Sequence, residues 1–178
     1  MRIFVAGLSK SGKTTRSHRA ATVRGDLDYV GVSKLLKDTG GILPVHTIND
    51  AFLNQNKATE ALQALPRQKP YQLIDGHALI ETAEGPFIVP DVFFDEIQPT
   101  LLIYVEDNPQ DLYLRRLPLG MKQMPAELAA LTAIERSVCE RIAARRGIAL
   151  VVLHSPTTEA FSDSLARQLG KLSGRQSE

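Results

Sequence analysis

The sequence predicts a three-layer α/β protein, in which helices cover both faces of a parallel sheet. Short apolar runs alternate with segments of helical periodicity along the chain, which is the pattern of consecutive βαβ units. The runs are apolar nearly throughout, as expected of parallel strands that are buried on both faces. Five strands are predicted, at residues 2–6, 28–32, 71–74, 100–105 and 148–153.

Caps and chain-breaking residues mark several helices between these strands. Asn108-Pro109 and Ser155-Pro156 each combine a capping side chain with a proline that the first helical turn tolerates. Helices are predicted from residue 13 onward, near 33–39, over 48–65, 110–117 and 126–146, and after residue 156. The buried faces of the last two are predicted to be Leu128, Leu131, Val138 and Ile142, and Phe161, Leu165, Leu169 and Leu172.

Length and composition favour a single domain over residues 1–178. Hydrophobic residues make up 43% and charged residues 23%, values typical of a globular protein. The net charge of +1 argues against a nucleic-acid partner, and Cys139, the only cysteine, excludes an intrachain disulfide. We find no secretory signal and no apolar run long enough to cross a bilayer, so we expect a cytoplasmic protein without membrane contacts.

A phosphate-binding loop is predicted at residues 7–14, which read GLSKSGKT and match GxxxxGK[ST] at every fixed position. A strand before the loop and a helix after it give the motif its required context. The two glycines let the backbone wrap a phosphate chain, while amide hydrogens and the helix N-terminus supply positive potential. An ordinary strand-to-helix turn is the alternative. The residues predicted to bind ATP here are Gly7, Ser9, Lys10, Ser11, Gly12, Lys13, Thr14 and Thr15, of which Lys10 and Ser11 could also face water.

Three side chains are predicted to act at the phosphates. Lys13 would bridge the β- and γ-phosphates, and the Thr14 hydroxyl would ligate Mg²⁺. Asp75 follows the third predicted strand, where a carboxylate can order the water ligands of the metal. A turn-forming Asp before Gly76 is the alternative. His77 could reach a substrate or hold the turn.

Cations that could neutralise a transferred phosphoryl group lie further along the chain. Arg115 and Arg116 close one helix, and the break at 117–125 before the next helix is predicted to be a short lid over the nucleotide. Arg136 and Arg141 lie on that next helix. Either of them could instead be a solvated surface charge.

Two long segments interrupt the strand–helix alternation, at residues 33–70 and 77–99. Ligands of parallel sheets bind at the carboxyl ends of the strands, and long connections there commonly carry substrate. The first segment holds two predicted helices joined by Gly40-Gly41 and Pro44. We therefore expect these segments to contribute to a substrate site.

Taken together, these motifs resemble the P-loop nucleoside monophosphate kinases, and among them the archaeal-type adenylate kinases most. The matching stretches are the loop at 5–15 and the segment 73–85, which begins Leu-Ile-Asp-Gly-His. A proline-containing loop and the strand and helix within 100–117 continue the match. Arg136 falls where the family carries an arginine. The resemblance extends over about residues 1–155.

The resemblance implies a P-loop NTPase fold with a five-stranded parallel sheet, and ATP and Mg²⁺ as cofactors. Segment 33–70 would bind the acceptor, and segment 117–125 would form the lid. Arg116 would pack near the adenine. The catalytic residues would be Lys13, Asp75 and Arg136, with Thr14 and Asp75 holding the metal.

The predicted lid and acceptor region carry fewer arginines than those of the family. Lys122 is the only cation in 117–125, and Lys57 is the only one in 50–65. An ammonium does not readily replace a guanidinium that clamps a phosphate. Two functions therefore stay open: a phosphotransferase acting on a nucleoside monophosphate, and a nucleotide-binding regulatory or assembly protein with little kinase activity. A GTPase is disfavoured because the sequence has no Asn-Lys-x-Asp motif, and oligomerisation stays open.

Overall fold

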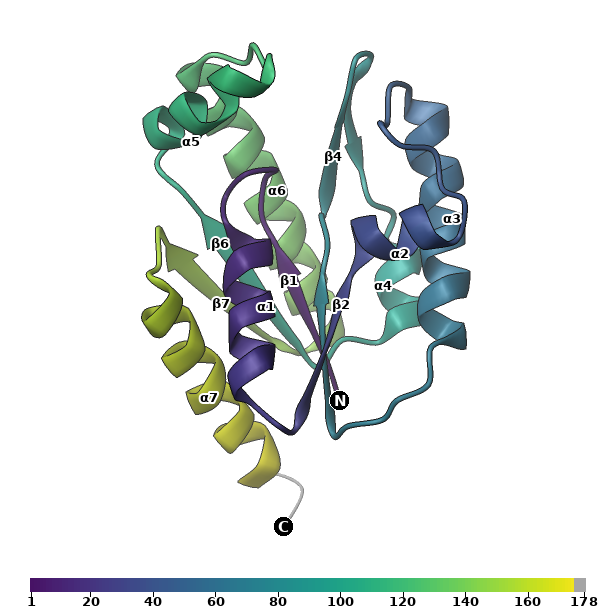
Figure 1. The fold of residues 1–178 in the computed structure, drawn as a ribbon, viewed down its shortest axis with the longest axis vertical. Coiled ribbons are helices and arrows are strands. Elements are labelled where there is room, and N and C mark those ends of the chain that lie inside the picture. The colour runs from purple at the N-terminus through teal and green to yellow at the C-terminus, as the bar shows by residue number, and fades with distance from the viewer. Residues whose placement is uncertain (175–178) are drawn as a thin grey trace.

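The computed structural model describes residues 1–174, and its centre is a five-stranded parallel sheet (Figure 1). The strands lie in the order β2-β3-β1-β6-β7. They are β1 (Arg2–Ala6), β2 (Leu27–Gly31), β3 (Tyr71–Asp75), β6 (Leu101–Glu106) and β7 (Ala149–His154). The predicted fold class and its five strands are confirmed, each strand end lying within about one residue of its expected position.

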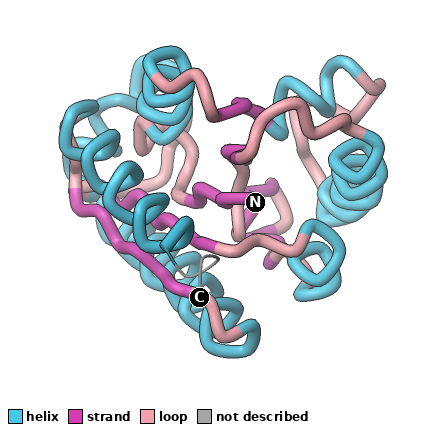
Figure 2. The backbone as a smooth tube through the Cα atoms, turned by 90° about the horizontal axis from the view of Figure 1, so that it is seen from below, coloured by secondary structure: helices cyan, strands magenta, loops and turns pink. Residues whose placement is uncertain are grey.

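Helices cover both faces of this sheet, as Figures 1 and 2 show. One face carries α1 (Lys13–Val23) and α7 (Thr158–Gly174). The other carries α2 (Val32–Asp38), α3 (Ile48–Ala64), α4 (Asp91–Ile97) and α6 (Pro125–Arg146). Because side chains alternate along a strand, β1 sends Ile3 and Val5 into the first core and Phe4 and Ala6 into the second. This burial on both faces explains why the central strands read as continuous apolar runs.

The structure adds an antiparallel hairpin that the sequence did not predict. It pairs β4 (Leu79–Thr82) with β5 (Gly85–Ile88) and rises beyond the carboxyl end of β3 (Figure 1). Its strands have only four residues each, and β5 begins at Gly85, a residue typical of loops, which has a φ of 125° here. The tip of the hairpin contacts the start of α3, where the Ile48 amide donates to Glu84 Oε2 at 2.8 Å. The hairpin therefore closes against the predicted acceptor segment.

Capping contacts mark two of the predicted helix ends. The Asn108 side chain accepts hydrogen bonds from backbone amides in the first turn of α5 (Pro109–Arg116), and α6 ends at Gly147 with a φ of 63°. The break after α5 contains a short 3₁₀ helix at Leu117–Leu119. The sequence did not predict α4, because the prolines around it obscure its helical pattern.

The predicted cap at Ser155 is wrong. Helix α7 begins at Thr158, where the Thr157 hydroxyl accepts from the Ala160 amide. The Ser155 hydroxyl donates to Asp107 instead.

The predicted apolar faces of α6 and α7 are largely buried. Leu131 and Leu172 are only partly buried, whereas the other members of both faces are buried. The polar composition of residues 173–178 predicts a frayed tail. Helix α7 extends through Gly174, and the rest of that prediction, at residues 175–178, lies outside the described part of the chain. Among the described helices, none combines the length and the apolar character needed to cross a membrane.

Candidate active site

The phosphate-binding loop lies between β1 and α1, at the carboxyl edge of the sheet. Gly7 has a φ of 152°, and a Cβ atom there would lie 2.4 Å from the Val105 carbonyl oxygen. Gly12 has a φ of 80° immediately before the first residue of α1. Both positions therefore require glycine, the first for space as well as for backbone conformation.

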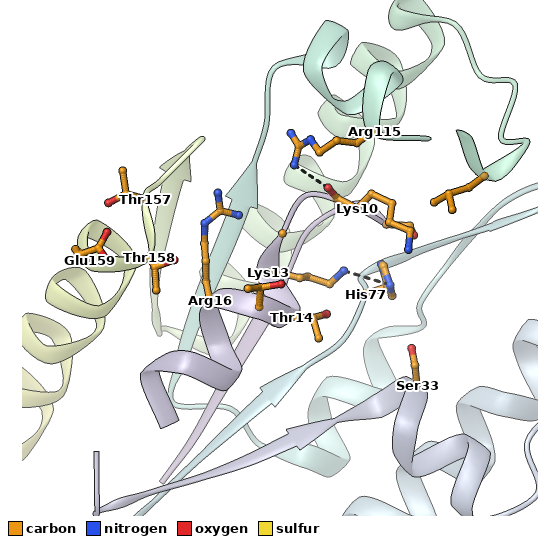
Figure 3. A pocket seen from close by; sticks show the side chains of 14 residues that line it. Lys10, Lys13, Thr14, Arg16, Ser33, His77, Arg115, Thr157, Thr158 and Glu159 are labelled. Carbon is orange, nitrogen blue, oxygen red and sulfur yellow. Dashed lines mark hydrogen bonds between the residues drawn. The ribbon is translucent and has the colours of Figure 1, made fainter. Parts of the chain in front are cut away.

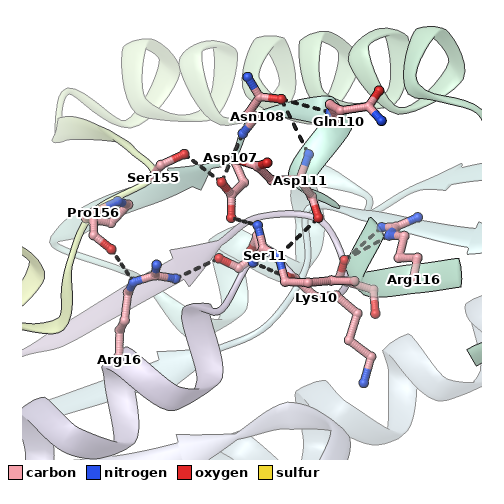
Figure 4. A network of polar contacts seen from close by, with 12 residues as sticks. Lys10, Ser11, Arg16, Asp107, Asn108, Gln110, Asp111, Arg116, Ser155 and Pro156 are labelled. Atoms are coloured by element: carbon pink, nitrogen blue, oxygen red, sulfur yellow. Dashed lines mark hydrogen bonds and ion pairs between the residues drawn. The ribbon is translucent and has the colours of Figure 1, made fainter. Parts of the chain in front are cut away.

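Three arginines hold consecutive carbonyl groups of this loop (Figures 3 and 4). Arg116 donates to Ser9 O at 2.8 and 3.1 Å. Arg115 donates to Lys10 O at 2.9 Å, and Arg16 donates to Ser11 O at 2.8 Å. A trans peptide points its carbonyl and the following N–H in opposite directions. The N–H groups that follow Ser9 and Ser11 are thus turned away from the arginines, as a phosphate-binding loop requires.

A cavity of about 1010 Å³ adjoins the loop (Figure 3). Small-molecule sites commonly measure about 300–1,000 Å³, so this volume suits a ligand as large as a nucleotide. The donor cavity, as we call it, is lined by Ser9, Lys10, Gly12, Lys13, Thr14, Thr15, Arg16, Ser33, His77, Arg115, Leu119, Thr157, Thr158 and Glu159.

Lys13 and His77 meet at the inner end of the donor cavity (Figure 3). Lys13 is 4% exposed, and its Nζ lies 3.3 Å from His77 Nε2. Burial lowers the pKa of Lys13, while the carboxylates of Asp75 and Glu135 oppose that shift. Burial and the neighbouring Lys13 ammonium hold the pKa of His77 well below its usual value. The imidazole is therefore neutral near pH 7 and can accept a hydrogen bond from Lys13.

Asp75 ends β3 beside Lys13 and Thr14, and the three line a common cavity of about 260 Å³. Its Oδ2 accepts a hydrogen bond from the Tyr29 hydroxyl at 3.1 Å. Burial raises the pKa of Tyr29, and the negative charge of Asp75 raises it further. The Tyr29 hydroxyl therefore stays protonated and donates the hydrogen bond. Within the part of the chain that the structure describes, the buried Asp75 Oδ1 has no hydrogen-bond partner.

The oxygen atoms of Thr14 and Asp75 fit the preferences of Mg²⁺. This ion takes oxygen ligands and is usually held by one or two protein groups together with substrate phosphates. Among residues 1–174 no cluster of three or more His, Cys, Asp or Glu side chains could hold a metal alone. The site thus suits an ion that arrives with a nucleotide.

A second cavity, of about 220 Å³, also has His77 in its lining. We call it the acceptor cavity. Its wall is mostly apolar, and it shares Ser9, Ser33 and His77 with the donor cavity. Its lining is Phe4, Ser9, Val32, Ser33, Leu36, Leu43, Val45, Asn54, Gln55, Gly76, His77, Leu79, Ile80, Glu81, Phe93 and Met121. The two cavities therefore meet beside Lys13.

Three carboxylates that the sequence did not single out support this arrangement. Both oxygens of Glu81 accept from Arg116 at 2.8 Å, and Asp107 pairs with Arg115. Glu135 is fully buried on α6, and its Oε1 accepts from the amides of residues 78 and 79 at 2.9 and 3.3 Å. Burial raises the pKa of Glu135 to about 7.

The sequence contained a pattern that could have identified Glu135 as a buried residue. It lies seven residues after Leu128 and seven before Ile142, within the predicted apolar stripe of α6. A carboxylate at such a position needs hydrogen-bond partners when it is buried. Here the partners belong to the turn after β3, so Glu135 fastens the His77 turn to α6.

Four predicted site residues line none of these three cavities: Gly7, Ser11, Arg116 and Arg136. Gly7 and Ser11 are buried within the loop, so the Ser11 side chain does not face water. Arg136 is 40% exposed and donates to Glu140 at 2.9 Å and Glu106 at 3.4 Å. Arg116 is fully buried and is bonded to Ser9 O and Glu81. The roles predicted for these two arginines, at the transferred phosphate and at the adenine, would require both side chains to change partners. Those roles stay predictions, as do the roles of the loop residues and Asp75.

We compared the chain with family models, curated protein sequences and solved structures. No family model and no curated protein sequence matches the chain. Among solved structures, a shikimate kinase from Acinetobacter baumannii in complex with shikimate is 16% identical with a TM-score of 0.61, over 98% of this chain and 93% of that one. A shikimate kinase from Aquifex aeolicus is 17% identical with a TM-score of 0.59, over 98% and 99%.

A thymidylate kinase from Candida albicans is also similar, at 14% identity and a TM-score of 0.59, over 97% of this chain and 92% of that one. At such identities the likeness concerns the fold. It shows that the chain folds as small P-loop kinases do, without singling out the archaeal-type adenylate kinases.

Proposed function

We propose that the protein is an ATP- and Mg²⁺-dependent phosphotransferase that phosphorylates a small molecule. The observation that carries the proposal is the meeting of two cavities at Ser9, Ser33 and His77, beside the buried Lys13. Transfer requires the γ-phosphate and the accepting atom to lie next to each other. A nucleotide in the donor cavity and an acceptor in the other cavity would meet this requirement.

The residues at the junction have distinct roles in this proposal. The loop amides and Lys13 bind the phosphates, while Thr14 and Asp75 hold Mg²⁺, whose positive charge offsets the charge of the phosphoryl oxygens. His77, as a neutral imidazole, orients the Lys13 ammonium. The acceptor atom bonds to the γ-phosphorus and the bond to the β-phosphate oxygen breaks, which yields ADP and a phosphorylated acceptor.

The acceptor that the sequence resemblance predicts is a nucleoside monophosphate. Segment 33–70 supports a binding role, since Ser33, Leu36, Asn54 and Gln55 from it line the acceptor cavity. Lys57 and Arg67 are the cations of this segment from which a monophosphate contact is expected. Lys57 instead donates to Gly40 O at 3.1 Å, and neither residue belongs to the lining.

An acceptor panel tests the proposal. The protein is incubated with ATP·Mg²⁺ and one small molecule at a time, and ADP and phosphorylated products are separated by chromatography. We expect ADP formation that depends on one class of acceptor and is lost in Lys13→Ala. Lys171→Ala, on α7 away from both cavities, is the matched control. ADP formation that is independent of every acceptor would contradict a phosphotransferase.

The second candidate is a nucleotide-binding regulatory or assembly protein. It is favoured by the pairing of arginines within the fold: Arg16, Arg115 and Arg116 hold loop carbonyls, and Arg136 holds two glutamates. Such a protein would bind ATP through the same loop without passing the phosphoryl group on. Saturable ATP binding with no phosphorylated product from any acceptor would favour it.

A further inference from the structure

The lining of the acceptor cavity has little free charge. Among the described residues that line it, Glu81 is the only one charged at neutral pH, because burial keeps His77 neutral. The Glu81 carboxylate is matched by Arg116, which is fully buried and donates to both of its oxygens at 2.8 Å. The one charged side chain of the described lining is therefore already neutralised by Arg116 and leaves no unpaired charge for a ligand.

Among the described residues, no lysine lies in the lining of the acceptor cavity: Lys34, Lys37, Lys57 and Lys122 on the surrounding segments are all outside it. Lys34 Nζ lies 2.5 Å from Asp38 Oδ2, and Lys57 donates to a backbone carbonyl. Lys13 faces the junction with the donor cavity, where it serves the transferred group. A phosphate dianion inside the cavity would thus be desolvated without a free cation in the described part of the lining, which is unfavourable.

The neutral part of the lining suits a molecule with an apolar body and a polar edge. Phe4 and Phe93 lie edge to face with ring centroids 5.9 Å apart, and aliphatic side chains form the remaining walls. The Gln55 side chain is 8% exposed, and its Nε2 has no hydrogen-bond partner among the described residues. A buried donor without a partner is unfavourable, and a ligand that accepts from it gains affinity and selectivity.

Asn54, next to Gln55, holds one wall of the acceptor cavity in position. Its Oδ1 accepts from the Ile42 amide and its Nδ2 donates to the Ile42 carbonyl, both at 2.7 Å. These bonds fasten the connection between α2 and α3 to α3, which places Leu43 and Val45 in the lining. Both the oxygen and the nitrogen of the Asn54 amide thus bond to the backbone of Ile42, whereas Gln55 Nε2 has no partner among the described residues.

We infer that the phosphate acceptor is an uncharged nucleoside rather than a nucleoside monophosphate. The base would pack against the apolar wall, with Gln55 at its polar edge, and a sugar hydroxyl would face the junction at Ser33 and His77. The hydroxyl oxygen bonds to the γ-phosphorus of ATP, ADP leaves, and the hydroxyl proton passes to solvent. This inference rests on the proposed function and narrows its acceptor.

Matched pairs of acceptors test it. Adenosine with AMP, guanosine with GMP, cytidine with CMP and thymidine with TMP are each supplied with ATP·Mg²⁺, and products are resolved by chromatography. We expect at least one nucleoside to be phosphorylated with a kcat/KM roughly tenfold or more above that of its monophosphate, as expected when burying a charge without a partner costs at least about 1.4 kcal/mol. Binding to the ADP-loaded protein, measured by calorimetry, should show the same preference.

Gln55→Leu provides the second arm, with Gln63→Leu, an exposed glutamine on the same helix, as its control. We expect Gln55→Leu to raise the KM for the nucleoside while ADP affinity stays unchanged. The inference is overturned if the monophosphates are preferred, if a different acceptor class is phosphorylated, or if the two variants behave alike; in each case the phosphotransferase stands. If ATP binds and nothing is phosphorylated, both proposals fail.

Discussion

The donor and acceptor cavities meet at three residues but differ in charge. Four cationic side chains, Lys10, Lys13, Arg16 and Arg115, line the donor cavity, whereas the acceptor cavity is lined by apolar and neutral groups around a satisfied ion pair. A polyanion is therefore expected on one side of the junction and an uncharged molecule on the other. The comparison teaches that one fold can place a cationic cavity beside a nearly neutral one.

Arg116 joins the two regions, and its removal should have the largest effect on stability. Arg116→Met leaves Glu81 without its buried partner and frees the Ser9 carbonyl. Loss of one member of a buried ion pair costs about 3–5 kcal/mol of unfolding free energy. Urea denaturation measures the loss. Arg115→Met, at a side chain that is 41% exposed, should lose much less, and equal losses would contradict the joining role of Arg116.

Lys13→Ala should cause the next largest effect, confined to the donor side. We expect turnover to fall by roughly 10²–10³-fold, as when one charge-stabilising donor is removed. The rise in melting temperature with millimolar ATP·Mg²⁺ should also largely disappear, since a ligand stabilises only the state that it binds. Thermal denaturation with and without nucleotide measures this. An unchanged shift in the variant would mean that the loop does not bind ATP.

Asp75→Asn should reduce turnover by about 10–100-fold, as expected for a residue that orders metal ligands. The change preserves shape but removes a charge, so we expect ATP affinity to fall less than turnover and the Mg²⁺ requirement to rise. A magnesium titration of the initial rate checks both points. Asp163→Asn, an exposed position on α7, is the control. Normal kinetics in Asp75→Asn would leave Asp75 as a turn residue.

Glu135→Gln should have the smallest effect of these changes. It alters the unfolding free energy by an amount that depends on pH. The pKa of Glu135 is raised from 4.5 to about 7 in the folded protein, so the folded state binds a proton that the unfolded state has released between these values. Glu135 therefore loses stabilising effect as pH rises from about 4.5 to about 7, whereas glutamine does not titrate. Between pH 5 and pH 8, the difference in unfolding free energy between variant and wild type should shift in favour of the variant by on the order of 2 kcal/mol. No change between the two pH values would contradict the buried, proton-binding Glu135.

Local patterns were sufficient to predict much of the donor side. The glycine loop, the strand before it and the Asp at the end of β3 are each encoded within a few consecutive residues. The sheet was predictable for the same reason, since strands buried on both faces are apolar throughout. These features need no knowledge of distant contacts.

The acceptor cavity and the arginines that hold the phosphate-binding loop depend on contacts between residues far apart in sequence. No local sequence pattern encodes such contacts. Arg116 meets Ser9 across 107 residues of sequence, and Arg115 meets Lys10 across 105. Arginines at the end of a helix look the same in sequence whether they contact a ligand or a backbone carbonyl. The hairpin of β4 and β5 was missed because two four-residue strands carry a weak pattern.

The central claim is that a phosphoryl group crosses from one cavity to the other, and a labelled-phosphate balance tests it most directly. The protein is supplied with ATP labelled at the γ-phosphate, Mg²⁺ and the acceptor panel, and the label is followed in ATP, inorganic phosphate and acceptor. The account predicts label in one acceptor in an amount equal to the ADP formed, and none with Lys13→Ala. Label found only in inorganic phosphate, or left entirely in ATP, would contradict it.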